Sequence, residues 1–335
     1  MTAEPVLNDL VPIPGVWSRL ERVEDRLFEA SLSDDGFLTK VAQHLLEAGG
    51  KRFRPLLALL AAEFGPGGDD RPVEAGVAVE LIHVGSLYHD DVIDEADTRR
   101  GAASVNSNWT NTVAILAGDF LMARASEVAA ARLGQESVRL LARTYAELVE
   151  GQTRELQLVG DLDHTVEDYY RVIGGKTASL IRTSARLGAM ASDATDSAVE
   201  AVSTWAWELG LVFQMTDDAL DLVGTEESIG KPAGSDIREG TFTLPVLLAR
   251  EGPDGTRLRQ LLLQSRPYPE PVVEEVIALV RAAGSVDSVL DEALRRSEMA
   301  AEATAALTAG TARDVLTTMG TYLVERVEAV RESAA

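Results

Sequence analysis

Apolar residues recur every three or four positions through almost all of this 335-residue chain. The clearest stretches are residues 16–32, 73–93, 137–159, 199–223 and 286–332. This spacing is typical of helices that bury one face. No stretch alternates apolar and polar residues convincingly, and no Asn-Gly pair marks a hairpin between strands. The sequence therefore predicts an all-α fold.

Glycine and proline cluster at residues 65–68, 224–240 and 266–271, which predicts loops between helices. None of these clusters is a long linker rich in serine, glycine and proline. We therefore predict a single domain over residues 1–335, built from many long, mostly antiparallel helices around a deep central cavity.

The balance of charges limits the classes of partner. The chain carries 54 acidic and 31 basic residues, a net charge of −23, which argues against nucleic acid because phosphate backbones require a basic surface. The absence of cysteine excludes disulfides and thiolate chemistry. The N-terminus has no signal-peptide pattern, and no apolar run is long enough for a transmembrane segment, so a cytoplasmic location is expected.

Two aspartate motifs of the form DDxxD follow long apolar stretches. They consist of Asp90, Asp91 and Asp94, and of Asp217, Asp218 and Asp221. Residues three and four apart share one helix face, so each motif gathers carboxylates that would repel one another without a cation. Mg²⁺ is usually bound by one or two carboxylates plus substrate phosphates. Two such motifs facing each other would hold a diphosphate between metal ions, whereas the alternative is a pair of acidic, solvated helix ends.

Basic residues stand close to glycines and to these motifs. Lys51 follows Gly49-Gly50, Lys176 follows a second glycine pair, and Lys231 follows a glycine just after the second motif. Arg99 and Arg100 come directly after the first motif. Cationic side chains beside such turns form anion pockets, although each residue alone could be a surface cation or a helix cap.

Two further polar residues lie on the same helix faces as the aspartates. His83 is two turns before Asp90, and Gln214 is one turn before Asp218. Each is either a hydrogen-bonded core residue or a donor near the phosphate site.

Five segments of the chain together resemble the trans-isoprenyl diphosphate synthase (polyprenyl synthetase) family. They are GGKRFRP at 49–55, ELIHVGSLYHDDVIDEADTRRG at 80–101, GKT at 175–177, FQMTDDALD at 213–221 and GKPAGSDIREGTFTLP at 230–245. The resemblance implies an all-α homodimer that joins isopentenyl diphosphate to an allylic diphosphate with about three Mg²⁺ ions per active site.

The resemblance also implies a role for each matching residue. All six motif aspartates would bind metal, and the catalytic group would comprise Asp90, Asp91, Asp94, Lys176, Asp217, Asp218 and Lys231. Arg99, Lys176, Thr177, Gln214 and Lys231 would hold the allylic diphosphate. Gly50, Lys51, Arg54, His83 and Arg100 would hold isopentenyl diphosphate. One departure is Thr241, where many members of the family carry lysine, so one phosphate contact is expected to be altered.

The length of the product would depend on residues below the first motif. Gly85 and Ser86 are small, whereas bulky aromatic residues at these positions stop chain growth early in the family. A product longer than farnesyl diphosphate is therefore expected. The first expectation is a long-chain polyprenyl diphosphate for a quinone side chain. Geranylgeranyl diphosphate is the alternative product. A regulatory subunit without activity, a terpene cyclase and an acidic helical scaffold are the alternative functions.

Overall fold

The computed structural model describes residues 5–224 and 232–334 and confirms the all-α prediction. Its elements up to residue 132 are α1 (Pro5–Leu10), α2 (Pro14–Ala30), α3 (Gly36–Glu47), α4 (Phe53–Ala61), η1 (Ala62–Phe64), α5 (Arg71–Ile93), β1 (Thr98–Arg99), β2 (Ala102–Ala103), α6 (Val105–Asn108) and α7 (Asn111–Arg132). Next come α8 (Gln135–Leu158), α9 (Val166–Ile173), η2 (Gly174–Ala178), α10 (Ser179–Ala191) and α11 (Asp196–Val223). The last elements are α13 (Ser235–Glu239), α14 (Leu244–Arg250), α15 (Gly255–Leu262), α16 (Glu270–Ala282), α17 (Ser285–Ala303), η3 (Thr304–Ala306) and α18 (Thr311–Ala334).

The described residues form two compact units, with boundaries inside helices α8, α10, α11, η3 and α18. The first unit comprises residues 5–146, 180–203 and 306–315, and the second comprises residues 147–179, 204–224, 232–305 and 316–334. The prediction of one domain around a central cavity therefore stays a prediction.

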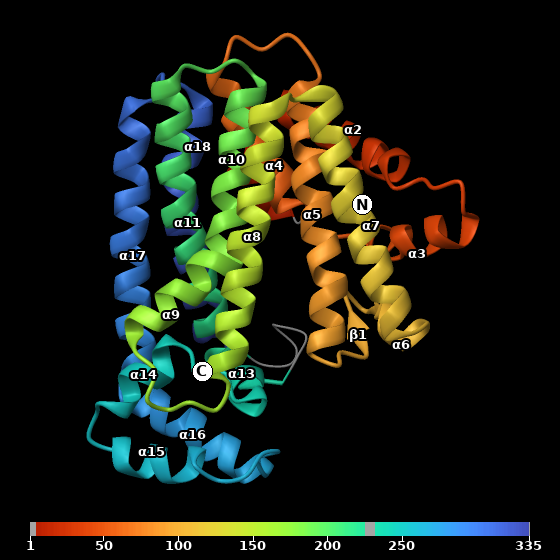
Figure 1. Ribbon diagram of the computed structural model, residues 1–335. Coiled ribbons are helices and arrows are strands. Elements are labelled where there is room, and N and C mark those ends of the chain that lie inside the picture. The colour runs from red at the N-terminus through yellow and green to blue at the C-terminus, as the bar shows by residue number, and fades with distance from the viewer. Residues whose placement is uncertain (1–4, 225–231, 335) are drawn as a thin grey trace. The chain divides into compact units, whose positions relative to one another are not determined.

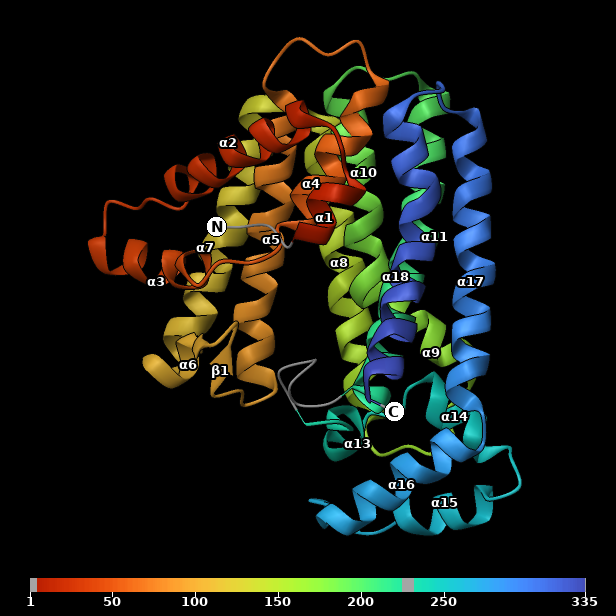
Figure 2. The ribbon, with the colours of Figure 1, turned by 180° about the vertical axis from the view of Figure 1, so that it is seen from behind.

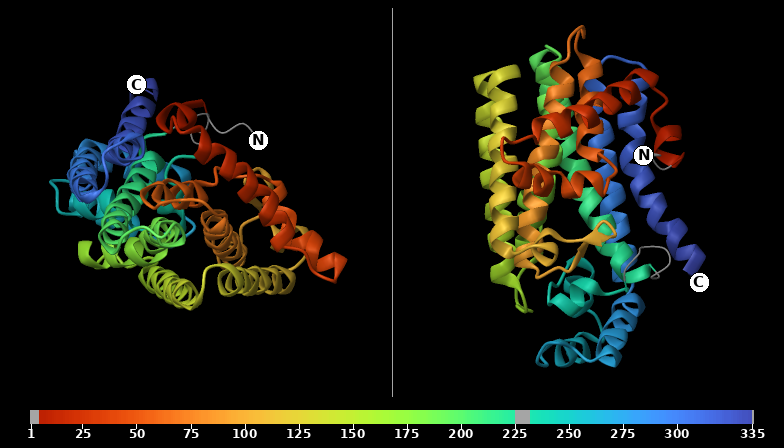
Figure 3. Two further views of the ribbon diagram at one scale, coloured as in Figure 1. Left: turned by 90° about the horizontal axis from the view of Figure 1, so that it is seen from above. Right: turned by 90° about the vertical axis from the view of Figure 1, so that its right-hand side faces the viewer.

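Helix α5 is the centre of the first unit. It packs against α7, α4 and α2, and it runs antiparallel to α7 (Figures 1 and 3). Its residues are buried almost all round, from Pro72 to Asp91, and α4 is likewise buried from Pro55 to Ala61. A helix that is apolar on every side must lie inside the core. Helices α2 and α3 are seen best from behind (Figure 2).

In the second unit, helices α17 and α18 lie side by side in opposite directions (Figure 2). Hydroxyl groups share hydrogen bonds between Ser297 on α17 and Thr321 on α18, and between Thr304 at the C-cap of α17 and Thr317 on α18. The indole of Trp205 on α11 donates to the Leu316 carbonyl oxygen at 2.9 Å. The short helices α14, α15 and α16 pack on one another.

The structure differs from the predicted elements in three places. A two-stranded hairpin follows the first aspartate motif, because Arg100 and Gly101 both have positive φ (56° and 76°), as a tight hairpin turn requires. The expected loop at 224–240 contains the short helix α13. The expected helical tail is interrupted before Thr311, where Gly310 has a φ of 153°.

Candidate active site

The first aspartate motif lies at the C-terminal end of α5. Asp91 is fully buried, Asp90 is half-buried, and Asp94 is exposed at the C-cap of the helix. Asp91 Oδ1 accepts a hydrogen bond from Arg99 Nε at 2.7 Å, whereas its Oδ2 is buried and has no hydrogen-bond partner among the described residues. Burial raises the pKa of Asp91, and the Arg99 guanidinium opposes this shift.

The chain that follows this motif is held by an asparagine that the sequence did not single out. Asn106 Nδ2 donates to the carbonyl oxygens of Asp91 and Ala96, at 3.1 and 3.0 Å. Ser104 Oγ also donates to the Ala96 carbonyl oxygen. These bonds fix the return of the hairpin, which directs Arg99 to Asp91.

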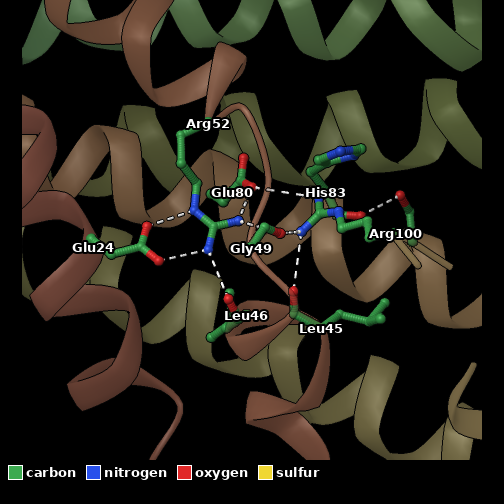
Figure 4. A network of polar contacts seen from close by, with 9 residues as sticks. Glu24, Leu45, Leu46, Gly49, Arg52, Glu80, His83 and Arg100 are labelled. Atoms are coloured by element: carbon green, nitrogen blue, oxygen red, sulfur yellow. Dashed lines mark hydrogen bonds and ion pairs between the residues drawn. The ribbon is translucent and has the colours of Figure 1, made fainter. Parts of the chain in front are cut away.

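The basic turn at residues 49–55 is organised around Arg52 (Figure 4). Its guanidinium is buried and donates to both oxygens of Glu24, at 2.6 and 2.8 Å, and to Glu80 Oε1 at 3.2 Å. A further bond reaches the Leu46 carbonyl oxygen at 3.1 Å. Arg52 therefore stabilises the turn from inside the protein. Neither glutamate was identified from the sequence.

Arg100 contributes to the same network (Figure 4). Its Nη1 donates to the carbonyl oxygens of Leu45 and Gly49, and its Nη2 lies 3.9 Å from Glu80 Oε1. A Cβ on Gly50 would lie 2.8 Å from Arg100 Nη1 and 2.9 Å from Arg52 Nη1, so a larger residue would have to displace these guanidinium groups. The structure thus gives Gly50 and Arg100 a role in packing, and their predicted substrate contacts stay predictions.

Positive charge surrounds His83 on α5. Burial, and then the charges of Arg54 and Arg100, hold the pKa of His83 well below its ordinary value. The imidazole is therefore neutral at pH 7, and arginine guanidinium groups act on it from several sides. Arg54 is half-buried and Lys51 is exposed, so both can reach an anion from the same turn.

The two residues expected to control product length lie on α5. A Cβ on Gly85 would lie 3.0 Å from Met122 Cε and 3.1 Å from the Gly118 carbonyl oxygen, both on α7. Ser86 is buried, and its hydroxyl donates to the His83 carbonyl oxygen at 2.8 Å. Gly85 thus has a packing reason to be small, and the effect of both residues on product length stays a prediction.

The second aspartate motif lies at the C-terminal end of α11. Asp217 is exposed, whereas Asp218 and Asp221 are each only 3% exposed. The Asp221 carboxylate accepts hydrogen bonds from the backbone N–H groups of Ser235 and Asp236, at 3.3 and 3.2 Å. Asp221 therefore fixes the start of α13 on the end of α11, which the sequence did not indicate.

A chain of hydrogen bonds runs from α9 through Asp218 to η2. Tyr169 donates its phenolic proton to Asp218 Oδ2 at 2.6 Å, and Gln214 Nε2 donates to Asp218 Oδ1 at 2.8 Å. Thr177 Oγ1 then donates to Gln214 Oε1 at 2.8 Å. Burial raises the pKa of Asp218 to about 7, against the opposing effect of the hydrogen bonds from Tyr169 and Gln214. Tyr169 was not identified from the sequence.

Lys176 lies in a π-helical turn, η2, inside a helical run that continues from α9 into α10. Gly175 allows this turn to touch α8, since its Cβ would lie 2.9 Å from the Glu147 carbonyl oxygen and 3.0 Å from Gly151 Cα. Lys176 Nζ donates to Glu155 on α8. These distances show that Gly175 serves the packing of η2 on α8. π-turns of this kind are also frequent at functional sites.

These residues line a pocket of the second unit with an empty volume of about 560 Å³, including its open mouth. It is lined by Glu155, Leu158, Val159, His164, Tyr169, Val172, Ile173, Lys176, Thr177, Gln214, Asp218, Thr241, Phe242 and Thr243. Thr241, the predicted departure from the family, is thus in the pocket wall. Lys231 lies outside the described residues.

The carboxylates fit a hard divalent cation, because their oxygens are the ligands that Mg²⁺ prefers and Asp91 Oδ2 has no donor within the described part of the chain. Over residues 5–224 and 232–334, no three His, Asp or Glu side chains come together closely enough to hold a metal ion by themselves. The two motifs lie in different units, and their expected meeting stays a prediction.

Comparison with known proteins gives consistent matches. A family model for polyprenyl synthetase matches residues 35–280. The chain is 41% identical over 324 residues to the nonaprenyl diphosphate synthase of Mycobacterium tuberculosis, covering 96% of each protein. It is 41% identical over 270 residues to heptaprenyl diphosphate synthase component 2 of Geobacillus stearothermophilus, covering 81% of this chain and 83% of that protein.

A solved structure agrees with these sequence matches. The polyprenyl synthase of Caulobacter crescentus, crystallised with calcium and isoprenyl diphosphate, has a TM-score of 0.88 and 32% identity, covering 97% of this chain and 98% of that one. The resemblance that the motifs indicated is confirmed. The chain therefore belongs to the polyprenyl synthetase family.

Proposed function

We propose that the protein is a Mg²⁺-dependent trans-prenyltransferase that condenses isopentenyl diphosphate with an allylic diphosphate into a long all-trans polyprenyl diphosphate. The observation that carries the proposal is the Asp91 carboxylate, which Arg99 holds by one oxygen while the other is buried without a donor. The family, and relatives named nonaprenyl and heptaprenyl diphosphate synthase, support it.

Each unit supplies one group of phosphate ligands in this proposal. In the first unit, Lys51, Arg54 and His83 bind isopentenyl diphosphate, with Gly50 and Arg100 shaping the turn. In the second unit, Lys176, Thr177 and Gln214 bind the allylic diphosphate. We also assign to this substrate Arg99 of the first unit, and Lys231, which lies outside the described residues. Neutral His83 can donate one N–H to a phosphate oxygen, and surrounding guanidinium groups favour the anion.

The motif aspartates would hold Mg²⁺, which supplies Lewis-acid stabilisation of the leaving diphosphate. Lys176 and the other cations lower the cost of the negative charge that develops when the allylic C–O bond breaks. A carbon–carbon bond then forms between the allylic carbon and the double bond of isopentenyl diphosphate, and one proton is lost to the released diphosphate. Leu158, Val172 and Phe242 line the pocket with apolar surface, which limits the access of water to a reactive carbocation.

The assembly and location are also part of the proposal. Neighbouring exposed apolar side chains on α7 (Ile115, Leu116), and two more a helical repeat of seven apart on α8 (Val149, Leu156), support a homodimer, because grouped apolar residues on a surface mark interaction sites whereas single ones do not. None of the helices within the described residues is long and apolar enough to cross a membrane. The cytoplasmic location rests on the sequence alone.

A product assay tests the proposal. The purified chain is incubated with isopentenyl diphosphate, Mg²⁺ and in turn dimethylallyl, geranyl, farnesyl and geranylgeranyl diphosphate, and the dephosphorylated products are sized by mass. Products longer than geranylgeranyl, abolished by EDTA, are expected. A stop at geranylgeranyl would favour the shorter-chain alternative.

Lack of activity in the chain alone would have a different meaning. The Geobacillus relative is named component 2 of a synthase, which is compatible with a subunit of a heteromeric enzyme. No elongation by the chain alone, with activity only after a partner is added, would support that reading, and a cyclic hydrocarbon product would indicate a cyclase.

A further inference from the structure

Asp218 is held at both carboxylate oxygens by side chains from the second unit. Tyr169 Oη donates to Oδ2 at 2.6 Å and Gln214 Nε2 donates to Oδ1 at 2.8 Å. Tyr169 is 4% exposed and Asp218 is 3% exposed, so both groups are shielded from water. A buried carboxylate depends on such donors, because an oxygen without one carries its full cost of desolvation.

These two bonds fix the direction of the hydrogen-bond chain beyond Asp218. Gln214 turns its amide N–H₂ toward Asp218 Oδ1 and its carbonyl oxygen toward the Thr177 hydroxyl. The Thr177 hydroxyl donates to Gln214 Oε1 at 2.8 Å, and the Gln214 amide keeps a second N–H that can donate to a diphosphate oxygen. Thr177 is the neighbour of Lys176 in η2, so the chain also fixes the wall that carries that cation.

We propose that Tyr169 is a positioning residue for the proposed reaction, which acts through Asp218 to orient Gln214 and Thr177 on the allylic-diphosphate side of the pocket. The inference rests on the proposed function. In this proposal Tyr169 does not touch the reacting atoms. Its hydroxyl is needed because it orients the groups that do touch the substrate.

The neighbouring tyrosine provides a matched control. Tyr170 is on the same helix, and its hydroxyl donates to Glu292 at 3.2 Å while its ring lies 4.5 Å below the Arg296 guanidinium. Tyr170 does not line the pocket. Replacement of either tyrosine by phenylalanine removes one buried or half-buried hydroxyl from α9, but only Tyr169→Phe removes a donor from Asp218.

Steady-state kinetics with farnesyl and isopentenyl diphosphate separate the two variants. Tyr169→Phe is expected to raise KM for farnesyl diphosphate about ten-fold, the effect of one hydrogen bond to a charged group, and to leave KM for isopentenyl diphosphate within about two-fold. Tyr170→Phe is expected to leave both KM values near those of the wild type. Equal changes in the two variants, or a Tyr169→Phe effect on both substrates alike, would overturn the inference.

A stability measurement tests the same contact without any turnover. Urea unfolding of the wild type, Tyr169→Phe, Asp218→Asn and the double variant, all in EDTA, gives the coupling between the two side chains. The double variant is expected to have at least the unfolding free energy of the weaker of the two single variants. If instead the two single losses of unfolding free energy add up in the double variant, the inference is contradicted. If the wild type transfers no prenyl group, the proposed function fails. The four unfolding measurements still decide whether Tyr169 positions Asp218.

Discussion

Single residues in the first unit are fixed by ion pairs between distant parts of the sequence. Arg52 joins Glu24 on α2 to Glu80 on α5, and it has a left-handed backbone with a φ of 47°. A conformation that non-glycine residues rarely adopt persists only where surrounding contacts hold it. We therefore attribute the shape of the basic turn to Arg52, although Lys51 and Arg54 are the residues assigned to the substrate.

This attribution predicts a large loss of stability in Arg52→Met. The substitution removes the hydrogen-bonded partner of Glu80, which is 1% exposed, and leaves only Arg100 at 3.9 Å; breaking a buried pair in this way costs about 3–5 kcal/mol. Urea unfolding measures the change. Arg22→Met is the control, because Arg22 pairs with Asp70 on the exposed surface and should lose at most about 1 kcal/mol. Similar small losses in the two variants would show that the network does not hold the turn.

Because the pKa of Asp218 is raised in the folded state, we expect the stability of the protein to depend on pH. Burial raises its pKa in the folded state to about 7, above the ordinary value of 3.8, so the folded protein binds more protons than the unfolded chain between these pH values. The contribution of Asp218 to the free energy of unfolding is therefore fully present below about pH 4 and is lost as the pH rises toward 7. In EDTA, the unfolding free energy of the wild type relative to Asp218→Asn should fall across this range by a few kcal/mol. A difference that stays flat or rises would contradict the shift.

At the scale of elements, glycines set how closely helices approach within each unit. Gly188 on α10 faces α4, where a Cβ would lie 1.9 Å from the Ala58 carbonyl oxygen. Gly151 on α8 faces η2 in the second unit, where a Cβ would lie 2.5 Å from Lys176 N. Because these neighbours are backbone atoms, they cannot move aside without shifting a helix.

Gly188→Ala is therefore expected to destabilise the protein by about 3 kcal/mol, the upper part of the usual cost of overpacking. Gly15→Ala on α2 is the control, since its Cβ would meet nothing within 4 Å and alanine is the better helix former. Thermal and urea unfolding measure both variants. If Gly188→Ala unfolds like the wild type, the close approach of α10 and α4 is wrong.

At the scale of the whole molecule, the proposed homodimer predicts a change of mass after one substitution. Leu116 on α7 is 59% exposed, and a lysine there would place a charge in the proposed interface, which should produce monomers in sedimentation equilibrium. Leu263→Lys is the control, because Leu263 is 67% exposed and belongs to none of the helices assigned to the interface. An unchanged dimer in Leu116→Lys would exclude α7 from the interface, and a monomeric wild type would exclude the homodimer.

The sequence by itself determined the fold class, most helix positions and the family. Helical periodicity is local, so residues 73–93 and 199–223 predict α5 and α11 to within three residues. The aspartate motifs could be recognised because their chemistry needs several carboxylates on one helix end. The same reasoning missed the hairpin, whose turn uses Arg100 and Gly101 in place of Asn-Gly.

Only the tertiary structure decided which side chains support these motifs. Tyr169 and Asp218 are 49 residues apart, and Arg52 and Glu80 are 28 residues apart. Apolar spacing shows that a helix has a buried face, but it does not show which helix covers that face. The partners of buried polar groups, the π-turn at Lys176 and the packing role of Gly85 all depend on the choice of neighbouring helix, which is fixed only when the helices pack.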